Sequence, residues 1–256
     1  MQVRSRAEEG RRVQLAQLSD SLASFSIAQN PRILPEETRQ FSLELDESER
    51  TSVYDVLGDC DLPPDLHDAA PSRRLQFLAG RFCAAQALRA LGVADWQQQL
   101  RRDVNGGPAW PTGIAGSITH TDGFVSAAVA RTTDVEAIGI DTEQTISEPH
   151  ARSVASVIAW PIEVAAARAC GLTRLEALTL VFSAKETIFK CLHPRVGQMF
   201  HFHDVRLVDV NSLERTFQAR VVKPLSPAFP SGTLLEGRFD IHNQWIHTGM
   251  TLLAPQ

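Results

Sequence analysis

One long amphipathic helix restricts the fold of this chain more than any other feature of the sequence. From residue 173 to residue 192, apolar side chains recur at the spacing of one helical face, which predicts a buried stripe. The stripe consists of Leu175, Leu178, Phe182 and Phe189. We expect this to be the main helix of the second half of the chain.

The segment VFSAKETIFKCL, residues 181–192, places three charged residues inside this apolar helix. Because residues four apart lie on one helical face, Glu186 and Lys190 project side by side. Lys185 points about 100° away from Glu186 around the helix. A solvated ion pair worth a few tenths of a kcal/mol would give the same pattern, so the helix alone does not assign a function.

Segments with the patterns of β-strands surround this helix and a second predicted helix over residues 72–91. The predicted strands are 41–45, 51–57, 116–120, 124–130, 136–141, 204–210, 216–222 and 245–253. Helical pattern also covers 153–192, with breaks near Pro161 and Gly171. The order strand, helix, hairpin, strand, helices and strands predicts an α+β fold.

The length of 256 residues allows one large unit or two units of roughly 130 residues. Each half supplies one long helix and a small antiparallel sheet, so we expect a duplicated architecture. We place an N-terminal subdomain over residues 1–132 and a C-terminal subdomain over residues 133–256.

Composition excludes several classes of protein. The formal net charge of −5 argues against broad nucleic-acid binding, so any anion site must be local. No apolar run approaches the ~20 residues that span a bilayer, and we expect a soluble, cytoplasmic protein. The cysteines lack CxxC spacing, which suits a reducing compartment and argues against zinc. They are Cys60, Cys83, Cys170 and Cys191.

Acidic residues end one of the predicted strands. Asp141 and Glu143 flank Thr142, and alternation along an extended chain points both carboxylates to the same side. Together with Glu186 they offer the hard oxygen ligands that Mg2+ uses. The alternative, three unrelated surface acids, stays open on this pattern alone.

Basic residues accompany these acids in the sequence. A carboxylate-bound metal beside Lys190, Arg73, Arg81 and Arg102 would suit a ligand with several phosphates. This combination predicts phosphoryl-transfer chemistry. His120, at the end of an apolar strand, can bind a phosphate, transfer a proton or serve as a structural residue. The chain contains no GxGxxG, Walker, HExxH or GxSxG motif.

Most of these residues lie in four segments: RRLQFLAGRFCAAQAL (73–88), GGPAWPTGIAGSITHTDGF (106–124), AIGIDTEQ (137–144) and FSAKETIFK (182–190). Together they resemble the Sfp-type 4'-phosphopantetheinyl transferases, especially the enterobactin-synthesis branch, over most of the chain. In order, they are similar to the family's arginine-bearing first helix, its Pro-Trp loop and Ser/Thr-His strand, its G-[IV]-D-x-E metal motif and its signature helix, F/W-[ST]-x-K-E-[SA]-x-x-K. Thr187 stands where the family more often has Ser, and Arg102 where it often has Lys.

The resemblance implies the family's fold, with two similar α+β subdomains related by pseudo-twofold symmetry and the active site between them. It implies transfer of 4'-phosphopantetheine from coenzyme A to a serine of an acyl, aryl or peptidyl carrier protein, with release of adenosine 3',5'-bisphosphate. Asp141, Glu143 and Glu186 would coordinate Mg2+, with Mn2+ as the alternative. The catalytic residues would be Asp141, Lys190 on the transferred phosphate, and Glu186 as general base, directly or through a metal-bound water.

The resemblance also assigns contacts with coenzyme A. These residues are Arg73, Arg81, Arg102, Thr119, His120, Lys185 and Lys190. Arg73 and Arg81 would reach toward the 3'-phosphate and the pyrophosphate, and His120 would bind the 3'-phosphate side or the diphosphate. For Lys185 two roles stay open, orienting Glu186 or binding phosphate.

Carrier proteins in this chemistry are generally acidic around the modified serine, so we expect an apolar and basic docking surface. The first candidate is the segment after Glu143, in which Val154, Val157, Ile158 and Trp160 offer apolar contacts or pack as a structural amphipathic helix. We expect no nucleic-acid partner and no membrane span. The length and the two halves favour a monomer over the shorter, trimeric type of carrier synthase.

Two other functions use the same residues. A magnesium-dependent phosphohydrolase would direct a metal-bound water at the phosphate. A degenerate carrier-binding or nucleotide-binding module would bind without turnover.

Overall fold

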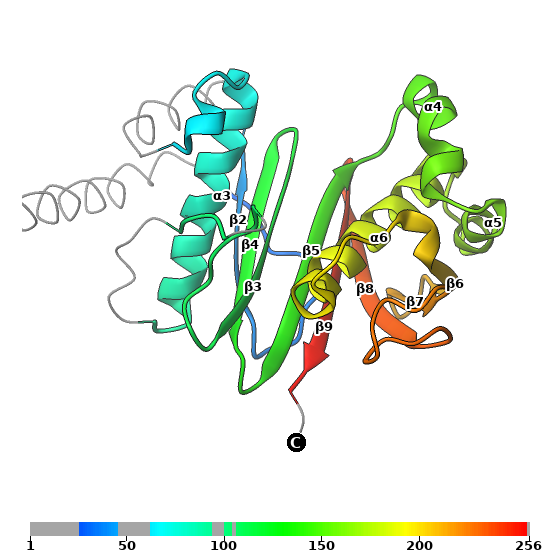
Figure 1. Cartoon of the computed structure of the whole chain (residues 1–256). Helices are drawn as coiled ribbons and strands as arrows, with labels where there is room; N and C mark the ends of the chain where they lie inside the picture. The colour runs from blue at the N-terminus through cyan, green and yellow to red at the C-terminus, as the bar shows by residue number, and fades with distance from the viewer. Residues whose placement is uncertain (1–25, 46–61, 94–99, 104–105, 255–256) are drawn as a thin grey trace, which may run out of the picture.

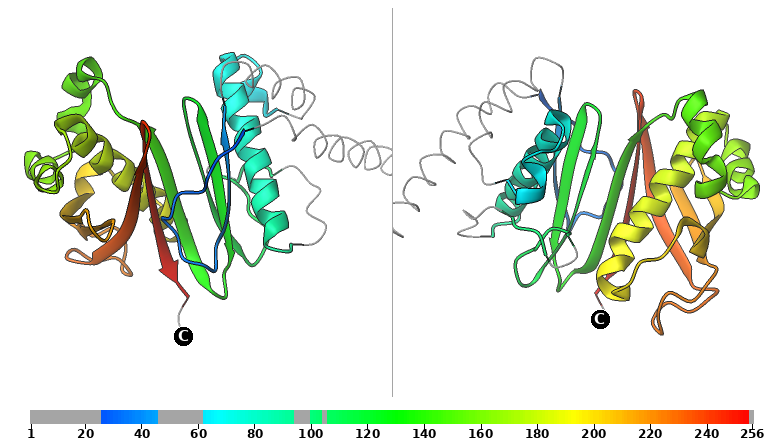
Figure 2. Two further views of the ribbon diagram at one scale, coloured as in Figure 1. Left: turned by 180° about the vertical axis from the view of Figure 1, so that it is seen from behind. Right: turned by 45° about the horizontal axis from the view of Figure 1, so that its top comes forward.

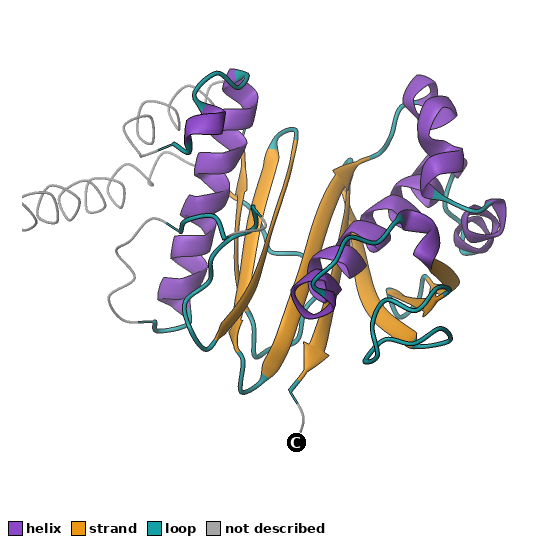
Figure 3. Ribbon diagram, in the orientation of Figure 1, coloured by secondary structure: helices purple, strands orange, loops and turns teal. Residues whose placement is uncertain are grey.

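The computed structural model of the chain describes residues 26–45, 62–93, 100–103 and 106–254. It contains two antiparallel sheets that stand side by side, each with a long helix packed against it (Figure 1). Figure 3 shows the strands in the middle of the molecule and the helices on their flanks. The predicted α+β class is confirmed.

The first sheet is four-stranded, in the order β1-β2-β4-β3. Its strands are β1 (Ser26–Ile27), β2 (Arg39–Glu44), β3 (Ile114–Thr121) and β4 (Phe124–Arg131). Helix α3 (Pro71–Ala90) packs on β2 and β4 through apolar side chains such as Leu78 and Phe82. A short 3-10 helix, η2 (Pro64–Leu66), precedes α3.

The second sheet is five-stranded, in the order β5-β9-β8-β7-β6. Its strands are β5 (Val135–Gln144), β6 (Val205–Asn211), β7 (Thr216–Val221), β8 (Leu234–His242) and β9 (Trp245–Leu253). Helices α4 (Glu148–Ile158), α5 (Pro161–Ala169) and α6 (Arg174–Val196) connect β5 to β6 by way of η3 (Phe202–Asp204). The breaks predicted near Pro161 and Gly171 are confirmed, since Pro161 opens α5 and Gly171 lies in the turn before α6.

One topology recurs in both sheets. In the first half, strand β2, helix α3 and hairpin β3–β4 follow one another, and β4 lies between β2 and β3. In the second half, strand β5, helix α6 and hairpin β8–β9 take the same order, and β9 lies between β5 and β8. Strands β6 and β7 extend the second sheet. The subdomain boundary at residue 132 stays a prediction.

Strands β3 and β5 belong to different sheets but run next to each other. Their contact uses side-chain hydroxyls. The Ser117 Oγ accepts a hydrogen bond from the Ile140 backbone N–H at 3.1 Å, and the Thr119 Oγ1 accepts one from the Thr142 N–H at 2.9 Å. We call this line of contacts the hydroxyl seam; it satisfies backbone donors at the edge of β5 that would otherwise be buried without partners.

A segment before β2 covers the face of the sheets opposite α3 and α6. The segment runs across both sheets in the view from behind (Figure 2). Ile33 is buried there in a cluster with residues of both halves, including Ala128 and Ile140. Gly249 on β9 has no room for a side chain, because a Cβ there would lie 2.6 Å from the Ile33 carbonyl oxygen. This packing holds the two sheets together from behind.

The elements differ from the predicted ones in a few places. The strand predicted over 51–57 lies outside the described residues. Strand β8 was not predicted, although Leu235 and Phe239 are buried and alternate with the exposed residues Leu234, Glu236 and Arg238. Strand β5 is longer than the predicted 136–141 and carries Asp141 and Glu143 within it. Within the described ranges, no helix has the length and apolar character needed to cross a membrane.

Candidate active site

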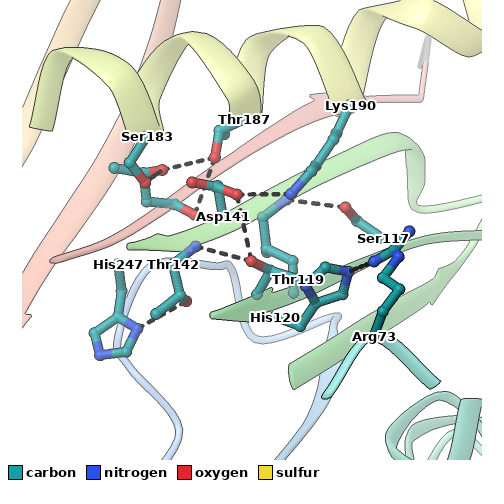
Figure 4. A network of polar contacts seen from close by, with 12 residues as sticks. Arg73, Ser117, Thr119, His120, Asp141, Thr142, Ser183, Thr187, Lys190 and His247 are labelled. Atoms are coloured by element: carbon teal, nitrogen blue, oxygen red, sulfur yellow. Dashed lines mark hydrogen bonds and ion pairs between the residues drawn. The ribbon is translucent and has the colours of Figure 1, made fainter. Parts of the chain in front are cut away.

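Helix α6 lies close against β5 and β9 because the contact residues are small. Gly139 on β5 faces the helix, where a Cβ would overlap the Thr187 carbonyl oxygen. The Thr248 Oγ1 on β9 shares hydrogen bonds with the Ser183 Oγ at 2.8 Å and with the Thr187 Oγ1 at 2.7 Å. These hydroxyls, drawn in Figure 4, fix the register of α6 against the strand that carries the predicted metal ligands.

Asp141 lies at the centre of this contact and is only 3% exposed. Its Oδ1 accepts a hydrogen bond from the Lys190 Nζ at 2.6 Å and a weaker one from the Thr119 Oγ1 at 3.3 Å (Figure 4). Its buried Oδ2 has no hydrogen-bond partner among the described residues. An acceptor without a partner in such a place is costly, and it marks a position where a ligand can bind.

The carboxylates of Glu143 and Glu186 lie within electrostatic reach of Asp141. Burial, with the charges of Asp141 and Glu186, raises the pKa of Glu143 to about 8, although Lys190 opposes the shift. Burial, with the charge of Asp141, also raises the pKa of Glu186 against the effect of Lys190. One lysine therefore does not balance three acids at this place.

The donor set fits a hard divalent cation, since it consists of carboxylate oxygens, one of which has no partner among the described residues. The geometry is not that of a metal site, however. Among the residues that the structure describes, no three His, Cys, Asp or Glu side chains are grouped so that they could hold a metal ion. Lys190 occupies the Asp141 Oδ1 instead. The ligand set Asp141, Glu143 and Glu186 stays a prediction.

His120 joins this site to helix α3. The Arg73 guanidinium donates a hydrogen bond to the His120 Nε2 at 2.8 Å (Figure 4). Burial, with the charges of Arg73 and Lys190, lowers the pKa of His120 to about 4. The imidazole is therefore neutral at pH 7 and lies between two cationic side chains, which is an arrangement suited to an anion.

Arg81 and Arg102 extend the positive charge along α3. Their guanidinium carbons lie 4.5 Å and 5.2 Å from the centre of the Phe77 ring. Burial, with the charges of Arg102 and Arg73, lowers the pKa of Arg81 to about 10. Arg102 pairs with Asp65 at 2.5 Å, and Arg81 donates to the Leu100 carbonyl at 2.8 Å. The structure thus brings the three predicted arginines together on one side of α3.

Lys185 lies in a position that does not fit phosphate binding. Its side chain is fully buried, and its Nζ donates to the Glu163 Oε2 at 2.8 Å and to the Ile158 carbonyl at 2.9 Å. Glu163 also accepts from the backbone N–H groups of Trp160 and Leu207. The lysine, one position before Glu186, therefore points into the core and joins α6 to the start of α5 and to β6. The predicted phosphate contact is corrected to this structural pair.

Thr119 has hydrogen-bond partners within the protein. It is 2% exposed, and its hydroxyl accepts from the Thr142 N–H and donates to the Asp141 carboxylate. Both bonds link β3 to β5, and they position Asp141. The predicted contact of Thr119 with coenzyme A stays a prediction.

The candidate docking segment is exposed at the turn between α4 and α5. Val157, Trp160 and Ile162 are 60%, 42% and 65% exposed, and the Trp160 ring lies edge-on to His203. Ile158, in contrast, is buried in the core of the second half. We call Val157, Trp160 and Ile162 the α4–α5 patch.

Sequence reasoning missed the residues that orient the site from a distance. Glu163 at the third position of α5, after Pro161 at the first, has the pattern of a helix start, which hides its second role as the partner of Lys185. Thr248 lies in an apolar strand with no signal of its own. Only the tertiary structure shows that these side chains meet α6.

Comparison with known proteins gives matches over both halves. Residues 63–130 match the family model of the 4'-phosphopantetheinyl transferase N-terminal domain, and residues 137–234 match that of the 4'-phosphopantetheinyl transferase superfamily.

Three curated proteins are similar to the chain. It is 34% identical to 4'-phosphopantetheinyl transferase Svp of Streptomyces mobaraensis over 73% of its own length and 75% of that protein. It is 29% identical to 4'-phosphopantetheinyl transferase PptT of Mycobacterium tuberculosis, over 74% and 83% of the two lengths. It is 29% identical to enterobactin synthase component D of Salmonella typhi, over 74% of each.

Proposed function

The chain belongs to the 4'-phosphopantetheinyl transferase superfamily, whose members transfer phosphopantetheine to carrier proteins, and from this premise we propose how its own residues carry out the reaction. We infer that coenzyme A is the donor, a serine hydroxyl of an apo carrier protein is the acceptor and Mg2+ is the metal. The serine oxygen attacks the phosphorus that bears the pantetheine arm. The bond from that phosphorus to adenosine 3',5'-bisphosphate breaks.

The observation that carries the proposal is that an anion-binding group and a buried carboxylate lie next to each other where the two halves join. Arg73, His120 and Lys190 form an anion-binding group, with Arg73 and His120 from the first half. Asp141 lies beside them with a buried oxygen that lacks a partner in the described structure. A pyrophosphate with a bound cation supplies what each group needs.

When bound, Mg2+ would be held by Asp141, Glu143 and Glu186 and would supply positive charge against the phosphoryl oxygens. Lys190 contacts the phosphate that is transferred and stabilises the charge that develops there. Glu186 accepts the serine proton, directly or through a metal-bound water. Arg73, Arg81 and Arg102 hold the remaining phosphates of coenzyme A.

The α4–α5 patch is the proposed docking surface for the carrier protein. It presents three apolar side chains to solvent on the segment that follows the metal motif. Clusters of exposed apolar side chains are common features of protein-binding surfaces. Arg152 on α4 adds positive charge beside the patch, although it pairs with Glu148 in this structure.

We propose that the enzyme works as a monomer in the cytoplasm, because the chain itself contains both halves that form the proposed site. Cys83, Cys170 and Cys191, the cysteines in the described ranges, are free thiols, which suits a reducing compartment. Light scattering after size exclusion measures the mass of the particle, and a trimer would contradict the monomer.

The test is intact-mass spectrometry of apo acyl, aryl and peptidyl carrier proteins after incubation with the enzyme, coenzyme A and Mg2+. We expect a mass gain of about 340 Da, the phosphopantetheine group that phosphoryl transfer would move. EDTA and the Glu186→Ala variant should abolish it. Hydrolysed coenzyme A without carrier would instead support the phosphohydrolase, and binding without turnover would support a degenerate module.

A further inference from the structure

A cavity of about 160 Å³ lies on the face of the sheets opposite α3 and α6, away from the acids of the active site. Asp141 faces α6, and alternation along β5 points Thr142 to the other face, where it meets His247 at 3.0 Å. The register of β8 and β9 brings Asp240 next to His247 on this face. We call this space the back-face cavity.

Both halves of the molecule contribute to its walls. Glu44 and Phe124 come from β2 and β4 of the first sheet, whereas Asp240, Trp245 and His247 come from β8 and β9 of the second. Arg32 contributes from the segment that crosses behind both sheets, seen from behind in Figure 2. At ~30 Å³ per water, the space equals about five waters or one small organic molecule.

The ring of Trp245 lines this cavity. Trp245 is 6% exposed, and its Nε1–H has no hydrogen-bond partner in the part of the chain that the structure describes. Buried tryptophans normally satisfy this donor, because an unmade hydrogen bond costs about 1–3 kcal/mol. The Phe124 ring lies beside it, and the centroids of these two rings are 5.4 Å apart. The His247 ring lies next to Phe124, with 4.9 Å between their centroids. The cavity therefore offers an aromatic wall.

Charged groups of both signs face the same space without pairing. Glu44 and Asp240 are half-buried carboxylates, and Arg32 is an exposed guanidinium. Among the described residues, no ion pair engages any of the three. Burial lowers the pKa of His247 to about 4, so this ring is neutral at pH 7 and adds no charge. Two carboxylates and one guanidinium line one cavity, and this combination matches a ligand that carries both charges.

We propose that the back-face cavity binds a small zwitterion with a primary ammonium group and a carboxylate, the size of a free α-amino acid. The ammonium group lies by the carboxylates of Asp240 and Glu44, against the aromatic wall. The carboxylate pairs with Arg32. This site is separate from the proposed active site and does not depend on the proposed reaction.

The experiment follows the indole N–H resonance of Trp245 in 15N-labelled protein, identified by its loss in Trp245→Phe. Glycine, L-serine and L-valine are added to the full chain, each up to about 10 mM, a range that detects millimolar binding. Isobutylamine and isovalerate serve as matched controls, because they are L-valine without its carboxylate and without its amino group. MgCl2 is titrated separately.

We expect a saturable shift of this resonance with at least one amino acid, and a dissociation constant at least about tenfold higher for both single-charge analogues. Asp240→Asn and Arg32→Gln should each weaken binding about tenfold. The matched changes Asp134→Asn and Arg131→Gln, at exposed positions outside the cavity, should leave it unchanged.

Three results overturn the proposal. No saturable shift with any amino acid means that the cavity holds water only. An equal shift with isovalerate means a simple anion site. An equal shift with isobutylamine, or one with MgCl2, means a cation site.

Discussion

Two lysines five residues apart on α6 each pair with a carboxylate, and the two pairs differ in burial and in the number of other hydrogen-bond partners. In the first, Lys185 and Glu163 are both fully buried at 2.8 Å. The lysine also donates to the Ile158 carbonyl, and the glutamate also accepts backbone N–H groups of Trp160 and Leu207. Several partners therefore surround both charges.

In the second pair, the side chain of Lys190 is 28% exposed and that of Asp141 is 4% exposed. The Lys190 Nζ lies 2.6 Å from the Asp141 Oδ1. One carboxylate oxygen of Asp141 lacks a partner in the described residues. Two further acids, Glu143 and Glu186, lie within electrostatic reach of this carboxylate. The comparison teaches that residue type does not separate a structural pair from a functional one. Hydrogen-bond satisfaction does, because a saturated pair has nothing left to bind a ligand.

The largest effect on stability should come from breaking the saturated pair. Lys185→Met leaves the Glu163 carboxylate buried without its counter-charge, and we expect the free energy of unfolding to fall by about 3–5 kcal/mol. Urea denaturation measures the loss. The KM for coenzyme A should stay unchanged in the fraction that remains folded, because Lys185 does not reach the phosphates.

Lys223→Met is the matched control, since Lys223 is 72% exposed in its pair with Asp204. Its loss should stay within about 1 kcal/mol. Equal losses in the two variants, or a raised KM in Lys185→Met, would return Lys185 to phosphate binding.

The second pair should respond in the opposite way, through activity. Asp141→Ala should lower the rate of carrier modification by about 100- to 1,000-fold, because it removes a group that stabilises the transition state. The melting temperature should hardly change, because a carboxylate with an unsatisfied buried oxygen adds little stability. Intact-mass rates and thermal melts test both points. Wild-type transfer with Mg2+ present would remove Asp141 from the mechanism.

Lys190→Ala should lower kcat/KM by about 10- to 100-fold, which is less than the loss expected for Asp141→Ala. This range corresponds to one charged hydrogen bond to phosphate. Lys190→Arg should retain part of the rate because it keeps the charge. If kinetics stay unchanged in Lys190→Ala, this pair is a surface ion pair after all.

The smallest effect, counted per pH unit, is a pH dependence of the free energy of unfolding. Glu143 has its folded pKa raised from 4.5 to about 8, chiefly by burial and then by Asp141 and Glu186. The folded state therefore favours the protonated form, and stability falls as pH rises from about 4.5 to about 8. Urea unfolding in EDTA across this range measures the slope, at most about 1.4 kcal/mol per pH unit. Glu143→Gln should flatten it; an unchanged slope would mean that other groups cause it.

The sequence predicted the parts of the site that depend on local geometry. Strand alternation gave the shared side of Asp141 and Glu143, which agrees with the effect of the Asp141 charge on the pKa of Glu143. The α+β class followed from the order of periodic segments and is confirmed. These features depend on the chain within a few residues of each position.

Features that depend on distant residues escaped the sequence. Lys185 looked like its neighbour Lys190 because the partner that distinguishes it, Glu163, is 22 residues earlier on another helix. The part that Thr119 plays in positioning Asp141 was not visible in the sequence, because its bonds to Thr142 and Asp141 cross between two sheets. Strand β8 was missed because its charged residues point outward and its inward positions include Gly237.

The hydroxyl seam has a consequence for how the two halves stay together. A few side-chain bonds are a weak connection by themselves. The chain between β4, which ends at Arg131, and β5, which begins at Val135, is very short, so each half meets the other at an effective concentration in the millimolar range or above. If the backbone were cut in this link, assembly of the site would become a bimolecular reaction, and activity would depend on protein dilution.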